Sequence, residues 1–264
     1  MRFVNRGVVL CAAVLLAAAA PVAQATVIGP DAYGYKATNV VPFSWIDITG
    51  TGTQTLQGTD DSYTSGALGF TFNIYGKSYT SAFWSTNGLI TLGLPNNQSN
   101  SQSLTGDPLY PNVPAIAPLL DDWVAKVSSA SGVYYQTLGD PGSREFVLQW
   151  HDLRRKDESG DHIDFEAILF EGTNNILFQY ANTDTSWAPA THGGQATVGI
   201  RDVSGDINGR VLQWSYAVPN AAPDQSAILF STGSLSTIPE PVSMAGLMMG
   251  IGGLAGYVRR RRAV

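Results

Sequence analysis

Asp121 and Asp122 are the residues whose types and spacing best suit a metal ion. The pair follows the apolar run "APLL" and precedes Trp123, so the sequence predicts carboxylates at a strand end, next to an aromatic ring. A hard cation such as Ca²⁺ prefers several carboxylate and carbonyl oxygens. We expect a domain without a cofactor, and we keep calcium at Asp121 and Asp122 as the alternative hypothesis.

Two other acidic stretches could supply further ligands to such a site. They are the pair Asp60-Asp61 and the stretch "RDVSGDING", which contains Asp202 and Asp206. The second stretch is not an EF-hand loop, because Val203 is apolar and no glutamate closes the pattern. The other interpretation is that the 121–122 pair accepts hydrogen bonds from loop amides, and that the 202–206 stretch shapes a turn.

The sequence contains no recognisable catalytic motif. His151 and Asp152 are neighbours, so on a strand they point to opposite faces and cannot pair directly. No G-x-S-x-G, H-E-x-x-H, Walker or strand-following G-x-G-x-x-G motif occurs, and a glycosidase would need two carboxylates facing each other across a cleft. His151, His162 and His192 are interpreted as surface residues, not as joint metal ligands. We expect that this protein is not an enzyme, and a secreted hydrolase is the least favoured alternative.

Exposed aromatic rings could form a platform for carbohydrate, because the C–H faces of sugars lie on flat rings. Trp150 and Trp214 alternate with polar residues and are predicted to be core. The candidates for a platform are Trp45, Trp84, Trp123, Trp187 and Tyr110. Trp187, in the loop "NTDTSWAPATHGG", is the ring that a core role explains least, so it is the candidate ligand contact.

The elements that must position these residues are strands. Aromatic and β-branched runs such as "ALGFTFNIYG" and "GRVLQWSY" recur along residues 26–235 and are separated by turns such as Thr86-Asn87-Gly88. No window between the two ends of the chain keeps an apolar period of 3.6. The sequence predicts an all-β fold, an antiparallel β-sandwich over residues 26–235.

One hairpin can be predicted in detail, from "REFVLQWHDLRRKDESGDHIDFEAILF" with a turn at Ser159-Gly160. The period of two places His151 and His162 on the outer face. It also predicts a charged, solvated tip over residues 154–161. The residues predicted on the inner face are Phe146, Leu148 and Trp150 on the first strand and Ile163, Phe165, Ala167 and Leu169 on the second.

The order of these elements resembles nidogen-like β-domains and their bacterial extracellular relatives. The similarity is carried by "GFTFNIYGKSYTSAFWSTNGLITLG", "AIAPLLDDW", "GVYYQTLG", "REFVLQW", "FEAILFEGTNNILFQYAN" and "ATVGIRD", in that order. The resemblance implies an extracellular, non-catalytic domain associated with matrix or adhesion. It carries over no catalytic residue.

The N-terminus predicts a secretory signal peptide over residues 1–25. Arg2 and Arg6 give a basic start, an apolar run follows, and Ala23-Gln24-Ala25 is a small-x-small cleavage site. Cys11, the one cysteine of the chain, lies within this segment and would leave with it. The mature protein is therefore expected to have no disulfide and no thiolate metal site.

The C-terminus predicts a transmembrane helix over residues 242–258. This stretch has no charged residue and is near the shortest length that spans a bilayer. Its glycines are common in membrane segments. The arginines that follow should stay cytoplasmic and act as a membrane stop; they are Arg259, Arg260, Arg261 and Arg262.

Residues 239–264 resemble the PEP-CTERM sorting tail of Gram-negative bacteria. The resemblance rests on Pro239, Glu240 and Pro241, then the Gly-rich apolar stretch and the terminal arginine cluster. It implies that an exosortase-type enzyme is the partner that reads the sorting motif and processes the tail. An ordinary C-terminal anchor is the alternative.

The charge balance argues against nucleic acid as a partner. Six of the fifteen basic residues lie in the two terminal segments, but only one of the 21 acidic residues does, so residues 26–238 are strongly acidic. Such a surface repels phosphate backbones.

From the signal peptide, the sorting tail and the nidogen-like domain together, we expect an exported cell-surface or extracellular-matrix protein, associated with biofilm or exopolysaccharide, that binds or assembles with exopolysaccharide or a matrix protein. A lectin-like module, with or without a requirement for calcium, is the alternative.

Overall fold

The computed structural model describes residues 26–106, 112–203 and 208–235. The predicted signal peptide, the Pro239–Pro241 motif, the apolar stretch 242–258 and Arg259–Arg262 lie outside these residues, as do Tyr110 and Asp206. Within the described ranges no helix is long and apolar enough to cross a membrane. The one helical element there is a three-residue 3₁₀ turn, η1 (Thr191–Gly193).

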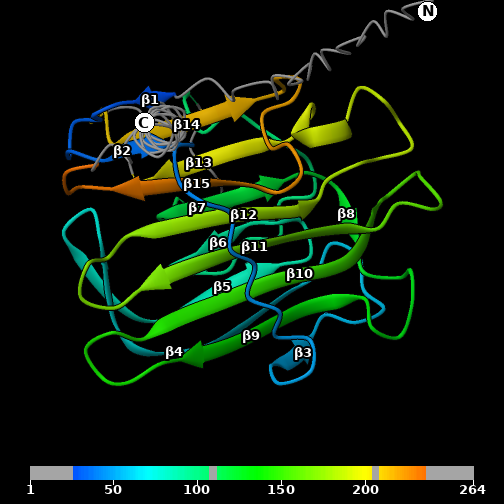
Figure 1. The fold of residues 1–264 in the computed structure, drawn as a ribbon, viewed down its shortest axis with the longest axis horizontal. Helices are drawn as coiled ribbons and strands as arrows, with labels where there is room; N and C mark the ends of the chain where they lie inside the picture. Colours follow the sequence, from blue (N-terminus) through cyan, green and yellow to red (C-terminus); the bar gives the residue numbers. More distant parts are fainter. Residues whose placement is uncertain (1–25, 107–111, 204–207, 236–264) are drawn as a thin grey trace, which may run out of the picture.

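The described residues form two antiparallel β-sheets that lie face to face (Figure 1), so the predicted all-β sandwich is confirmed. The large sheet consists, in spatial order, of β1 (Val27–Ile28), β2 (Lys36–Thr38), β15 (Ser226–Ser231), β12 (Ile176–Asn182), β11 (Ile163–Phe170), β10 (Glu145–Arg155), β9 (Gly132–Leu138) and β3 (Thr53–Thr55), and β8 (Trp123–Val124) pairs with β10. The small sheet consists of β14 (Val211–Tyr216), β13 (Thr197–Arg201), β7 (Ala115–Leu120), β6 (Ile90–Thr91), β5 (Lys77–Ser85) and β4 (Tyr63–Ile74).

The predicted hairpin is β10 and β11. Phe146 lies opposite Leu169, Leu148 opposite Ala167, and Trp150 opposite Phe165. All of these residues are buried in the main core, together with Ile163, so the predicted inner face is confirmed. The rings of Trp150 and Phe165 stack with centroids 4.9 Å apart and planes 10° apart, a pair that adds about 1 kcal/mol beyond its buried area.

A β-bulge interrupts this hairpin beyond Trp150. The register shifts between Trp150 and Leu153, and Asp152 has a left-handed φ of 55°. His151 and Asp152 consequently do not pair with each other, as predicted. Each pairs across the hairpin instead: His151 Nδ1 lies 2.6 Å from Asp164 Oδ1, and His162 Nδ1 lies 2.6 Å from Asp152 Oδ1.

The charged tip of the hairpin is less solvated than predicted. Asp161 is only 2% exposed. Its carboxylate accepts hydrogen bonds from the backbone N–H and the hydroxyl of Ser186, at 2.7 and 2.8 Å. The loop after β12 therefore covers part of the tip, a contact between segments about 25 residues apart that no periodicity reveals.

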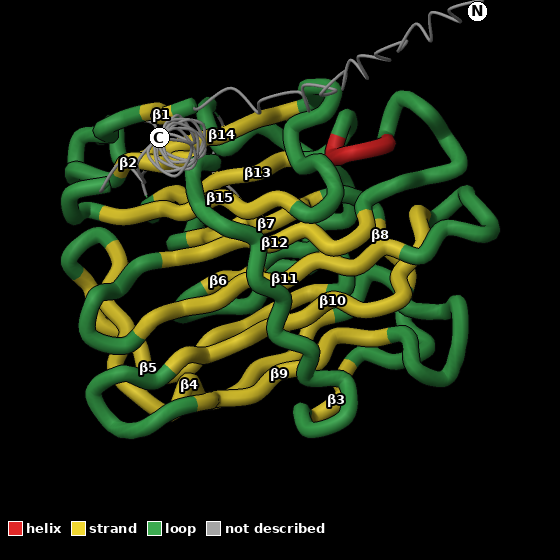
Figure 2. The backbone as a smooth tube through the Cα atoms, in the orientation of Figure 1, coloured by secondary structure: helices red, strands yellow, loops and turns green. Residues whose placement is uncertain are grey.

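Residues 39–52, the crossing segment, run over the outer face of the large sheet from β2 to β3 (Figures 1 and 2). Ile48 of this segment joins Tyr134, Val147 and Ile168 in a second apolar cluster on that face. The large sheet is therefore buried on both sides where the segment crosses it.

Candidate functional site

Asp121 and Asp122 lie in the tight connection between β7 and β8, where the strands are held by the loop that joins β5 to β6. The N–H of Trp123 donates to the side-chain oxygen of Asn87 at 3.0 Å, and the N–H of Asp121 donates to the Asn87 carbonyl at 3.2 Å. Asn87 is itself fully buried. This anchoring confirms the predicted position at a strand end.

The two carboxylates of this connection have different surroundings. Asp121 is 3% exposed; its Oδ1 accepts the N–H of Asp122 at 2.9 Å, and its Oδ2 lies 3.4 Å from Arg155 Nε. The interpretation of a carboxylate that accepts a hydrogen bond from a loop amide therefore describes Asp121. Asp122 instead meets Asp60 and Asp61, each offering an oxygen within 4.8 Å of the others.

The carboxylate cluster of Asp60, Asp61 and Asp122 has oxygens that could hold a cation. Asp60 Oδ1 and Asp122 Oδ1 are buried and have no hydrogen-bond partner. The amide of Asn87 donates to Asp61 Oδ1 at 2.9 Å. The ammonium of Lys156 lies 3.7 Å from Asp122 Oδ2 and would compete with a metal ion for this carboxylate.

Burial raises the pKa of Asp122 to about 6, and Lys156 only partly offsets the effect. The negative charges of Asp61, Asp60 and Asp121 raise this pKa further. Three carboxylates that repel one another in a partly desolvated setting are suited to a hard dication, which neutralises them and takes oxygen ligands. Asp202, the other predicted contributor, ion-pairs with Arg210 at 3.1 Å instead.

Trp187 is 39% exposed, as its role as a candidate ligand contact requires. The guanidinium of Arg155 lies over its ring, 4.6 Å from the ring centroid. Because Arg155 also ion-pairs with Asp121, it links Trp187 to the β7–β8 turn that carries Asp122. Sequence reasoning placed Arg155 in a solvated tip and missed this link.

Most of the other aromatic candidates prove to be structural. Trp84 and Trp123 are buried, with their indole N–H groups donating to Thr55 Oγ1 and to the Leu119 carbonyl. As platform residues these two predictions are wrong, because their rings fill the core. Trp45 is partly buried and stacks on Phe43 in the crossing segment. Trp150 is core as predicted, and Trp214 is a half-buried ring packed against the main core.

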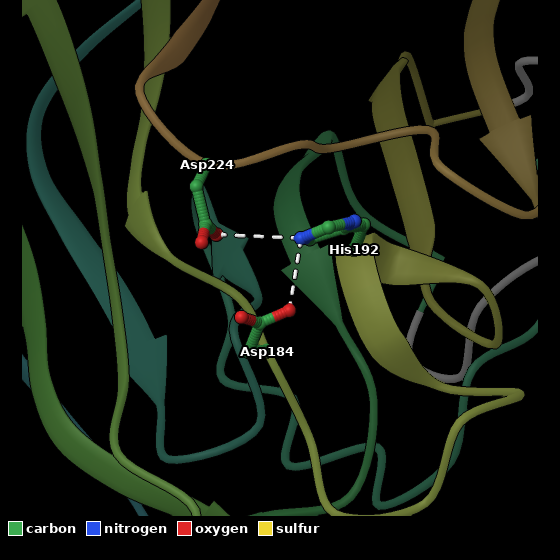
Figure 3. Close-up of side chains that lie close together, drawn as sticks. All are labelled: Asp184, His192 and Asp224. Atoms are coloured by element: carbon green, nitrogen blue, oxygen red, sulfur yellow. Dashed lines mark ion pairs between the residues drawn. The ribbon is translucent and has the colours of Figure 1, made fainter.

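A second group of possible metal ligands is formed by Asp184, His192 and Asp224 (Figure 3). His192 Nε2 lies 2.9 Å from Asp184 Oδ1 and 3.8 Å from Asp224 Oδ1. The three histidines do not converge, since His151 and His162 pair with other carboxylates. Sequence reasoning missed Asp184 and Asp224, because only the fold brings the loop before β15 to the loop after β12.

The chain matches a known protein family. Residues 32–242 match the NIDO-related family, over most of the chain. No curated protein matches the sequence, and no solved structure matches it. The match covers every strand of both sheets except β1, and both carboxylate-containing groups, so the chain belongs to the NIDO-related, or nidogen-related, family.

Proposed function

We propose that this chain is an exported cell-surface or extracellular-matrix protein that acts by binding or assembly and not by catalysis. The observation that carries the proposal is the partly exposed ring of Trp187, which lies in a polar loop of the β-sandwich. Binding residues are typically presented in this way, on loops positioned by a rigid scaffold. Membership of the nidogen-related family supports the same direction.

Export and sorting are proposed from the two ends of the sequence. Residues 1–25 have the order of regions of a signal peptide, and residues 239–264 have the motif, apolar stretch and arginine stop of a sorting tail. The proposed partner in the membrane is an exosortase-type enzyme that reads Pro239–Pro241. The protein would then reside in the envelope or matrix of a Gram-negative bacterium, with exopolysaccharide or a matrix protein as its ligand.

Processing of both ends tests this proposal. We expect the mature protein to begin at Thr26 and to lack the residues that follow the Pro-Glu-Pro motif, and we expect it in the envelope or medium fraction. Mass spectrometry of the natively expressed protein, combined with cell fractionation, measures both. Glu240→Ala should block C-terminal processing, whereas Ser236→Ala, just upstream, should not. An intact tail in the inner membrane of the wild type would contradict sorting and indicate a plain anchor.

A lectin-like role is the second candidate, because Trp187 offers both a ring and neighbouring polar groups. Aromatic rings supply apolar area, and a few well-placed polar side chains fix the orientation of a small ligand. Arg155 covers part of the ring and adds a hydrogen-bond donor beside it. Calcium at Asp60, Asp61 and Asp122 would release Lys156 from Asp122 and stabilise the same edge of the sandwich.

Trp187→Ala should weaken binding to matrix polysaccharide at least about tenfold, because truncating an anchoring aromatic residue typically costs ~2 kcal/mol. The matched control is Tyr33→Ala. Tyr33 is 40% exposed and lies under the guanidinium of Arg210, 5.5 Å away, so it has the same exposure and the same kind of neighbour. Binding is measured by isothermal titration with polysaccharide extracted from the producing bacterium.

Two further outcomes separate the parts of the lectin proposal. If binding is calcium-dependent, a chelator and Asp122→Asn should each weaken it, and added Ca²⁺ should restore only the wild type. Equal losses from the Trp187 and Tyr33 variants would show general surface adhesion and would contradict a site at Trp187.

A further inference from the structure

Asp184, His192 and Asp224 come from three segments whose side chains point toward one another (Figure 3). Asp184 follows β12, His192 lies in η1, and Asp224 precedes β15. One ligand atom from each lies within 4.8 Å of the other two. Among the described residues, His192 is the ion-pair partner of both carboxylates, and neither pairs with a lysine or arginine.

A simple ion pair accounts for only one of the two carboxylates. The single Nε2–H of an imidazole points in one direction, so it serves Asp184 at 2.9 Å and leaves Asp224, at 3.8 Å, beyond hydrogen-bond distance. The other histidines of the domain differ in this respect. His151 and His162 each lie 2.6 Å from one carboxylate, so each of these imidazoles has a single carboxylate partner. The group around His192 retains an excess negative charge that a dication would neutralise.

The donor set and its spacing fit a borderline-soft metal ion. Zn²⁺ binds imidazole nitrogen and carboxylate oxygen at about 2.0–2.2 Å in tetrahedral geometry, so its ligand atoms lie about 3.3–3.5 Å apart. The distances of 2.9 and 3.8 Å bracket this value. Small rotations of Asp184, whose side chain is 64% exposed, would complete the arrangement. The fourth position would be taken by water.

The backbone around the group is already fixed without a metal. Thr183 accepts the N–H of His192 at 2.9 Å, and its own N–H donates to Asp224 Oδ1 at 2.7 Å. The N–H of Ala222 donates to the His192 carbonyl at 2.9 Å. The ligands are thus held on anchored segments, which lowers the ordering cost of binding an ion.

We propose that Asp184, His192 and Asp224 bind Zn²⁺ and thereby clamp the loop after β12 to the loop before β15. Asp184 and His192 also bracket Trp187 in the sequence, so the ion closes the loop that carries this ring at both of its ends. The site does not depend on what Trp187 binds. Zinc binding and polysaccharide binding can therefore succeed or fail separately.

Titration of the purified full chain with Zn²⁺ alone, in a chelator-free buffer at neutral pH, tests the proposal. We expect one ion per chain by isothermal titration and a rise in Tm of about 5 °C at a hundredfold excess over Kd. Ca²⁺ should not replace Zn²⁺ at this site, because imidazole nitrogen is a poor ligand for a hard cation.

Asp184→Asn is the cleanest variant, because this exposed side chain has no described partner except His192. It should weaken Zn²⁺ binding more than tenfold and abolish the Tm rise while leaving the metal-free Tm nearly unchanged. His192→Gln should do the same. His162→Gln removes a histidine that has a single carboxylate partner, and Asp122→Asn alters the other carboxylate group, so both variants should still bind Zn²⁺. No heat signal with the wild type, or equal binding by Asp184→Asn, would overturn the proposal.

Discussion

Between about pH 4.5 and 8, the buried carboxyl of Glu166 makes the free energy of unfolding depend on pH. Glu166→Gln should remove this contribution. Glu166, on β11, is fully buried on the outer face of the large sheet, under the crossing segment. Its Oε1 accepts the N–H of Ile46 at 3.2 Å and the amide of Gln179 at 2.6 Å. Its Oε2 is buried with no hydrogen-bond partner.

Glu166 is the centre of a row of three polar side chains that hold the crossing segment. Gln149, Glu166 and Gln179 lie opposite one another on β10, β11 and β12. Their Oε1 atoms accept backbone N–H groups from alternate residues of the segment: Ile48 donates to Gln149 at 2.9 Å, Ile46 to Glu166, and Ser44 to Gln179 at 2.6 Å. A glutamine at position 166 preserves the shape and the acceptor.

Burial raises the pKa of Glu166 to about 8, and the hydrogen bonds from Ile46 and Gln179 only partly oppose this effect. The folded state therefore keeps the proton at pH values where the unfolded chain, with its ordinary pKa near 4.5, releases it. The stabilising contribution is complete below pH 4.5 and declines as the pH rises through the folded-state pKa. The loss should reach about 3–5 kcal/mol at pH 8.

Urea unfolding at pH 5 and pH 8.5 measures this effect. The wild type and Glu166→Gln should have similar free energies of unfolding at pH 5, and the variant should be the more stable at pH 8.5. Other groups titrate in the same range, so the difference between the two proteins is the quantity to compare. Glu145→Gln, at a half-buried position on the neighbouring strand, should change the pH dependence far less, because its charge is only a minor contributor to the raised pKa of Glu166. A parallel response from both variants would show that Glu166 is not the group responsible.

The burial of Glu166 also marks where sequence reasoning stops. The alternation along β11 correctly separates Phe165 and Ala167, which face the core, from Glu166 on the other face. That alternation makes Glu166 look solvent-exposed, as on any sheet with one wet side. Its burial depends on Ile46, which is 120 residues away in the sequence. Periodicity reports which face a residue occupies, not what covers that face.

In the candidate sites too, the residue types could be recognised from the sequence, whereas the contacts between distant segments could not. The sequence pointed to Asp122 and to Asp60-Asp61 because carboxylates next to strand ends are recognisable by type, and the fold brings them together. The Arg155–Trp187 contact and the meeting of His192 with Asp224 arise from segments that are distant in sequence. His192 also has a left-handed φ of 55°, which a local pattern does not predict for histidine.

Gly88→Ala is expected to be the most destabilising small substitution at the carboxylate cluster. Gly88 has a φ of +72°, and a Cβ there would lie 2.2 Å from the Leu119 carbonyl oxygen and 3.1 Å from Phe165 Cζ. The first neighbour is backbone of β7 and cannot rotate away. The added methyl group would therefore force the 86–88 turn and the end of β7 apart, at a cost of more than about 3 kcal/mol.

This close approach also builds the site. The turn that contains Gly88 presents Asn87 to Trp123 and Asp61, and so holds the 121–122 connection beside the cluster. Gly58→Ala is the matched control: its φ of +69° is nearly the same, but a Cβ there meets no atom within 4 Å. The control should lose only the conformational term, about 1–2 kcal/mol.

Thermal and urea unfolding of the two variants separate steric contact from backbone conformation. If Gly88→Ala is too unstable to purify while Gly58→Ala folds, the expected order is already met. Where both fold, the difference between their free energies of unfolding measures the contact with Leu119, because the left-handed conformation is common to both. Equal losses would mean that the turn relaxes freely away from β7. In that case Asn87 could not be the rigid support that keeps Asp61 and Asp122 close together, and the carboxylate cluster would lose its preorganisation.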